Sequence, residues 1–146
     1  MILTSLIQVY ERDLNKLKNE IESYTDEADL WKLSGEINNT GGNLCLHIVG
    51  NLNHYIGATL GETGYQRDRD SEFARKKVPV AEMSEGIDDT ILMIKNVLSS
   101  LKPDDLAKQY PKKAYPKKVT VYYFLLHLFG HMNYHIGQIN YHRRMI

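Results

Sequence analysis

The sequence has little of several features that mark common protein classes. Its 146 residues include one cysteine, which excludes an intramolecular disulfide. Eighteen Lys and Arg residues balance eighteen Asp and Glu residues, so the chain lacks the cationic excess that binding to a phosphate backbone requires. Its apolar runs are shorter than the roughly 20 residues that span a bilayer, and its first residues lack the basic start of a secretion signal. We therefore expect a cytoplasmic protein with no membrane partner and no nucleic-acid partner.

Four long segments carry apolar residues at helical spacing, and none shows the alternation of a strand. The first segment has its stripe at Leu3, Ile7, Tyr10, Leu14, Leu17 and Ile21. The second begins near Thr40–Asn43 and ends at about Leu60. The third follows Pro79 with Ile87, Ile91, Ile94, Leu98 and Leu101, and the fourth follows Thr120, a good N-cap residue. We predict an all-α four-helix bundle that forms a single domain, residues 1–146.

The connections between these segments are polar. Residues Thr25–Asn39 form a linker with one helical turn around Trp31, and a short helix is expected at Asp104–Gln109. The long connection Gly61–Val78 contains the run Arg67–Asp70, which is either a lid for a charged substrate or a solvated loop with local ion pairs. Four glycines fall inside predicted helices, where each costs about 1 kcal/mol relative to alanine. Close helix packing, room for a ligand or simple tolerance of glycine in a marginal helix would explain them: Gly50, Gly57, Gly130 and Gly137.

All six histidines lie in the second and fourth predicted helices. His127, His131 and His135 follow one another at four-residue steps, so they stack one turn apart within an arc of about 80°. The outer two lie about 12 Å apart along the axis, too far to share an ion easily, so a site needs His131 and one of its neighbours. His47 lies beside the apolar stripe of the second helix and is the best third ligand. His54 lies on nearly the same side but two turns away, and both cannot serve one site.

Other residues near these histidines could support such a site or only pack against it. Ligating histidines usually give their second N–H group to an acceptor, for which Asn51, Asn133 and Gln138 are available. His127 is expected in the pocket or behind the ligands, and Tyr134 lines the pocket or packs. Near the C-terminus, His142 is expected to face solvent. Cys45 is expected to be a buried, inert thiol, and because it lies two residues from His47 on one helix the two cannot form a nucleophilic pair.

The order and spacing of these motifs resemble the DinB-like superfamily of the YfiT type along essentially the whole chain. The resemblance is carried by GNLCLHIVGNLNHYI in the second helix and HLFGHMNYHIGQI in the fourth. The stretch GYQRDRDSEFARK between them is similar to a subfamily of unassigned function. The resemblance implies helix order 1-2-4-3 and a metal site of His47, His131 and His135. Ile136 stands where the family usually has arginine, which weakens any transfer of substrate chemistry.

The resemblance also implies a homodimer, nickel or zinc as the metal, and in some members thiol S-transferase activity with a low-molecular-weight thiol. Three imidazole ligands leave coordination positions open, which suits activation of either a thiol or a water molecule. A metal-dependent thiol S-transferase, a metal-dependent hydrolase and a non-catalytic metal-binding module related to stress all fit the residues. The basic run Lys112–Lys118 offers a nucleic-acid alternative, which its two prolines and the balanced net charge disfavour.

Overall fold

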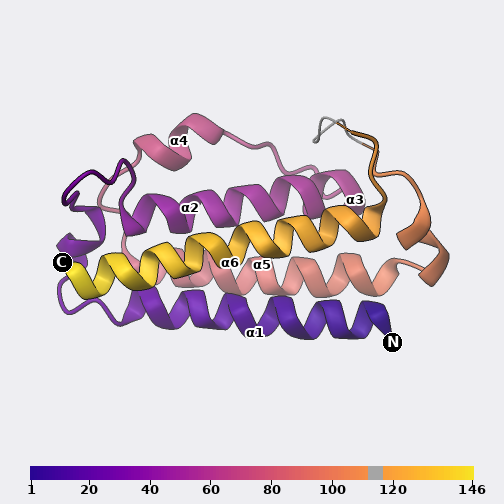
Figure 1. Ribbon diagram of the computed structural model, residues 1–146, viewed down its shortest axis with the longest axis horizontal. Helices are drawn as coiled ribbons and strands as arrows, with labels where there is room; N and C mark the ends of the chain where they lie inside the picture. The colour runs from indigo at the N-terminus through magenta and orange to yellow at the C-terminus, as the bar shows by residue number, and fades with distance from the viewer. Residues whose placement is uncertain (112–116) are drawn as a thin grey trace.

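The computed structural model describes residues 1–111 and 117–146 and forms an all-α helical bundle (Figure 1). Its four long helices are α1 (Ile2–Glu22), α2 (Gly41–Leu52), α5 (Val80–Ser100) and α6 (Val121–Met145). The predicted fold class is confirmed. The basic run at Lys112–Lys118 falls largely on residues 112–116, which lie outside the described residues.

The apolar stripes predicted from the sequence form the core. In α1, Leu14, Leu17 and Ile21 are fully buried, and in α5 Ile87 and Leu98 are as well. Polar residues on the opposite faces pair across the bundle, as in the exposed ion pair between Lys18 and Asp88 (2.9 Å). The buried faces supply most of the stability of such helices, because isolated helices of this length are marginal in water.

Side-chain caps define the start of the two helices that carry the histidines. The Thr40 hydroxyl accepts a hydrogen bond from the backbone N–H of Asn43 at 3.1 Å, and Thr120 does the same for Tyr123 at 3.1 Å. After Leu52 the second helix continues through a π-helical turn, η2 (Asn53–Ala58), into the short α3 (Thr59–Gly61). Its end therefore agrees with the prediction, whereas nothing in the apolar spacing predicted the π turn.

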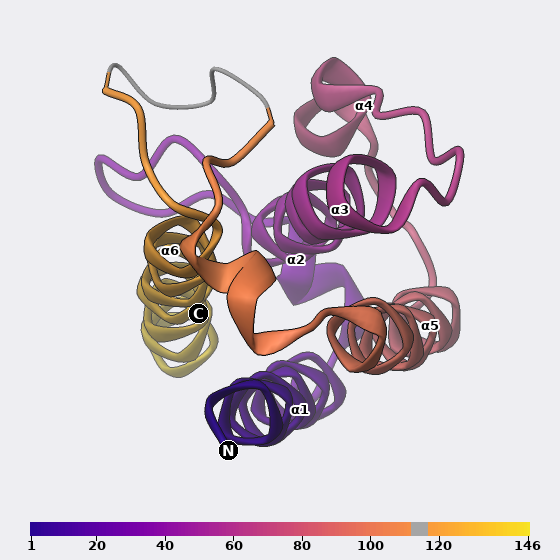
Figure 2. The ribbon, with the colours of Figure 1, turned by 90° about the vertical axis from the view of Figure 1, so that its right-hand side faces the viewer.

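The view along the bundle shows how the helices neighbour one another (Figure 2). α2 lies beside α6, as expected, and the order around the bundle is α1, α5, α2, α6. α1 therefore packs mainly against α5 and α6 and lies diagonally from α2. This order differs from the order 1-2-4-3 that the resemblance implied, because α1 has α6 and not α2 as its second neighbour. The apolar stripes fix which face of each helix is buried and leave the choice of neighbour open.

The connections contain three short helices. The linker after α1 holds the 3₁₀ helix η1 (Glu27–Trp31), which confirms the turn expected around Trp31, and η3 (Pro103–Ala107) corresponds to the short helix expected after Pro103. The polar connection between α3 and α5 holds α4 (Arg69–Ala74), capped by the Asp68 side chain. Because α2 and α5 run in the same direction, this connection returns along the outer side of α2 (Figure 1).

None of the helices in the described part of the chain combines the length and the apolar character that a membrane crossing requires.

Candidate metal centre

Three histidines from two helices meet on the face between α2 and α6. His131 and His135 lie one turn apart on α6, and His47 approaches from α2. The Nε2 atom of His131 lies 3.3 Å from Nε2 of His47 and 3.1 Å from Nε2 of His135. One ligand atom from each ring lies within 4.8 Å of the other two, so the group could hold one metal ion.

The outer nitrogens of two rings have oxygen partners that fix which nitrogen faces the cluster. His135 Nδ1 lies 2.7 Å from Oε1 of Gln138, and His47 Nδ1 lies 3.0 Å from Oε1 of Glu72. We assign a proton to each Nδ1, because the facing oxygens accept hydrogen bonds. The Nε2 lone pairs of both rings then point into the cluster. This is the hydrogen-bond pattern that supports histidine ligands in metal sites, and the donor set fits a divalent ion.

The two Nε2–Nε2 contacts of the cluster each need one proton, which His131 can supply. If His47 and His135 are protonated at Nδ1, then the Nε2–H of His131 can donate to both of their Nε2 atoms at 3.3 and 3.1 Å. For all three rings to bind one ion, His131 has to move this proton to its Nδ1 atom.

Two of the rings, those of His131 and His135, favour the neutral form. Burial and then the neighbouring His135 and His47 lower the pKa of His131 to about 4. Burial likewise lowers the pKa of His135. Neutral imidazole is the form that binds metal, so at neutral pH a cation does not have to displace extra protons from these rings.

Glu72 is the residue of the site that the sequence analysis missed. It lies on α4 and accepts hydrogen bonds from Arg67 at both oxygens, from Nε at 2.8 Å and from Nη2 at 2.9 Å. Burial would raise the pKa of Glu72, but the hydrogen bonds from His47 and Arg67 outweigh this effect and lower it. The carboxylate is therefore ionised behind His47. Arg67, which was expected in a lid or a solvated loop, lies instead against the site.

A family model matches residues 2–146 and is described as a protein of unknown function, DUF1572. The chain belongs to the DUF1572 family. A comparison with curated proteins gave no match.

Of the three polar residues expected to support the histidines of this DUF1572 protein, one contacts a cluster histidine. Gln138 contacts His135 as expected, whereas the Asn133 side chain donates to the backbone carbonyl of Phe129. Asn51 is buried one turn after His47, and among the described residues its Oδ1 has no hydrogen-bond partner.

The two aromatic candidates on α6 lie at the edge of the cluster. His127 stacks on the ring of Phe124, with centroids 5.6 Å apart, and is not part of the three-histidine group. Tyr134 is 66% exposed, and its ring lies 5.4 Å from that of His135. Tyr134 therefore covers one side of a cluster histidine and remains accessible to solvent.

His142 was expected to face solvent, and this expectation is wrong. Its ring is buried between α6 and the linker after α1. Nδ1 lies 2.6 Å from the Tyr24 hydroxyl, and Nε2 lies 2.8 Å from the backbone carbonyl of Lys32. The linker covers the last turns of α6, which the charged neighbours of His142 in the sequence did not suggest.

Cys45 is fully buried in the core, as expected. Burial raises the pKa of its thiol to about 12, because the thiolate would lose its hydration. The protein's own thiol is therefore neutral and inaccessible, and any reactive thiol has to come from another molecule.

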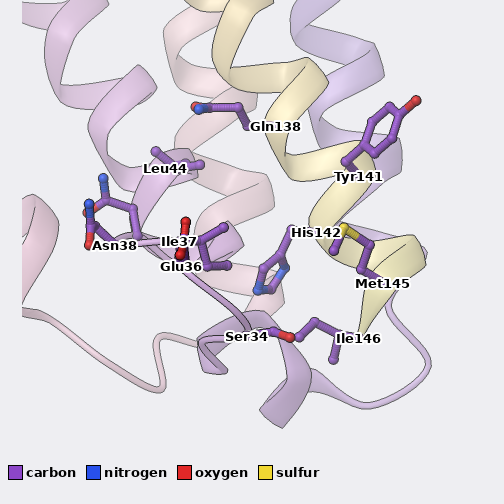
Figure 3. Close-up of a pocket in the computed structure, with 11 residues that line it drawn as sticks. Ser34, Glu36, Ile37, Asn38, Leu44, Gln138, Tyr141, His142, Met145 and Ile146 are labelled. Atoms are coloured by element: carbon purple, nitrogen blue, oxygen red, sulfur yellow. The ribbon is translucent and has the colours of Figure 1, made fainter.

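A cavity of about 360 Å³ shares one residue with the metal centre. Figure 3 shows the cavity between α6, which carries Gln138 and His142, and the segment that carries Ile37 and Asn38. The remaining lining combines aliphatic and polar side chains. Since Gln138 also contacts His135, a molecule in this cavity would lie next to a residue that orients a candidate ligand.

Proposed function

We propose that this DUF1572 protein is a DinB-like protein that binds one divalent metal ion through His47, His131 and His135. The observation that supports this most strongly is the convergence of three imidazoles whose ligand atoms lie within 4.8 Å of one another. Two of the rings also have an acceptor at the opposite nitrogen. Zinc and nickel are the proposed ions, because the family resemblance implies them and imidazole ligands suit both.

We further propose a metal-dependent enzyme of the thiol S-transferase type that uses a low-molecular-weight thiol. A bound divalent ion would supply Lewis-acid chemistry, stabilising the anion of a group placed at its open position. Both Glu72 oxygens accept hydrogen bonds on the far side of His47, so Glu72 orients that ring and is not placed to act as a general base. A thiol, with an ordinary pKa of about 8.5, needs a general base far less than water does.

The cavity beside Gln138 supports the same proposal. Its size, about 360 Å³, is within the range of small-molecule sites, and its mixed lining suits an amphipathic molecule. We propose that it receives the non-reacting part of a substrate. A hydrolase or a non-catalytic metal-binding module remain the alternative functions, and cytoplasmic location remains a prediction.

Elemental analysis of protein purified without an affinity tag tests the metal proposal. About one divalent ion per chain is expected, and no ion after reconstitution with zinc or nickel would contradict it. Conjugation of a small thiol to an electrophile tests the reaction. The rate should fall on chelation and in the His47→Ala variant, and a rate that survives chelation would contradict the metal-dependent transferase.

A further inference from the structure

The polar connection between α3 and α5, called the crossover below, is hydrogen-bonded to α2 at Glu72, the residue that contacts His47. The Asn43 side-chain amide donates to the backbone carbonyls of Glu72 at 2.9 Å and of Arg75 at 2.8 Å. The Glu72 carboxylate fills the space beside Gly50, where an added Cβ atom would overlap with Oε2. These contacts place the carboxylate independently of any ligand.

Arg67 holds the same carboxylate through its guanidinium group. Its Nε and Nη2 atoms donate to the two oxygens of Glu72 at 2.8 and 2.9 Å, a paired geometry that suits the planar guanidinium. The Arg67 and Glu72 side chains are only 10% and 6% exposed, so water competes little for these hydrogen bonds. Arg67 balances the charge of Glu72 and leaves Oε1 able to accept a further bond from His47.

Two contacts compete for Nδ1 of His47. Oε1 of Glu72 lies 3.0 Å away, and Nη2 of Arg67 lies 3.3 Å away. The first contact requires a proton on Nδ1, and the second requires a lone pair there. The carboxylate contact is shorter, and Nη2 already donates to Glu72, so the proton belongs on Nδ1. The lone pair of Nε2 then faces His131.

We propose that Arg67 and Glu72 form a clamp that fixes His47 in its Nδ1–H tautomer and presents Nε2 to the metal ion. The inference rests on the proposed metal function, which it deepens. Arg67 and Glu72 are positioning residues that act through His47. A carboxylate behind a ligating imidazole orients the ring and increases its basicity. The clamp also gives a role to the RDRDSEF stretch of the crossover, which contains both residues.

The tautomer can be measured without metal. Long-range ¹⁵N–¹H correlation spectra of the metal-free protein at about pH 8, above the ordinary imidazole pKa of about 6.5, report which nitrogen carries the proton. Wild-type His47 should be protonated at Nδ1. Glu72→Ala, which removes the acceptor, should give a mixture of tautomers, and Glu72→Gln, which retains an acceptor, should not. Protonation of wild-type His47 at Nε2, or an unchanged tautomer in Glu72→Ala, would overturn the clamp.

Zinc affinity, measured by competition with a chromogenic chelator, tests what the clamp does for the site. Glu72→Ala should weaken binding about 10–100-fold. Gly50→Ala should also weaken it, because it displaces the carboxylate while leaving the cluster residues unchanged. Two matched controls should retain wild-type affinity. Gly86→Ala adds a methyl group that meets open space, and Glu82→Gln changes an exposed ion pair with Arg75.

The two measurements separate the clamp from the metal function. Equal zinc affinity in wild type and Glu72→Ala would overturn the clamp. Absence of zinc binding in the wild type would overturn the proposed function, and the tautomer of His47 would still decide whether the clamp exists. Circular dichroism confirms that each variant is folded, and Gly50→Ala provides the second route to the result if Glu72→Ala does not fold.

Discussion

The metal-free protein should lose stability as the pH falls below the ordinary histidine pKa, and His131 should be a main cause. Its pKa is lowered from 6.5 to about 4 in the folded state. Between these values the unfolded chain takes up a proton that the folded protein does not, so acid favours unfolding. At 1.36 kcal/mol per pKa unit the upper limit is about 3 kcal/mol, of which about 2 kcal/mol would be reached by pH 5, and solvent screening at this partly exposed ring reduces both values.

The assay is urea unfolding of chelator-treated protein at several values between pH 7.5 and pH 5. His131→Gln removes the titrating ring, so the loss of unfolding free energy over this range should be smaller than in the wild type by up to about 2 kcal/mol. The comparison at pH 7.5, where His131 is neutral in both states, gives the change in packing alone. The same loss of stability in both proteins would refute the assignment of the acid effect to His131.

Four further predictions concern the metal and the assembly. His131→Ala should abolish metal binding and His127→Ala should retain it by elemental analysis, since only the first belongs to the cluster; equal loss would mean misassigned ligands. Metal affinity should collapse on acidification through the imidazole range, so a competition titration that stays flat from about pH 7.5 to 5 would argue against histidine ligands. Cys45→Ser should leave the rate of thiol conjugation unchanged, because the Cys45 thiol is buried. A loss of this rate in the folded variant would show that Cys45 takes part in the reaction. Light scattering should give a homodimer, for which exposed aromatics such as Tyr123 on α6 offer contact area, and a monomer mass would refute it.

The helices and the ligand spacing could be predicted from the sequence because both depend on local periodicity. The stripe through Leu14, Leu17 and Ile21 fixed the buried face of α1, and the four-residue step fixed the neighbourhood of His131 and His135. Inward placement of His47 followed from the apolar residues around it. These features require only the geometry of a single helix and one pairing between helices.

The remaining features depend on contacts between distant segments. Local periodicity assigns His142 to the end of a helix, but its burial depends on a linker 110 residues earlier, where the backbone carbonyl of Lys32 accepts its hydrogen bond. The spacing of apolar residues likewise predicts neither the π turn after Leu52 nor the order of helices around the bundle. The helix that carries Glu72 has six residues, too few to show an amphipathic stripe.

Gly50 connects the predictable and the unpredictable parts of the site. Its place inside a helix indicated room for a ligand or a close helix contact, and the structure shows that the space is taken by the Glu72 carboxylate. By contrast, Gly130 and Gly137 face open space, so no close neighbour explains the glycines inside α6. A helical glycine one turn from a candidate ligand is thus informative only once its neighbour is known. At Gly50 that neighbour is the group that orients His47, which ties the glycine, the crossover and the histidine cluster into one structural unit.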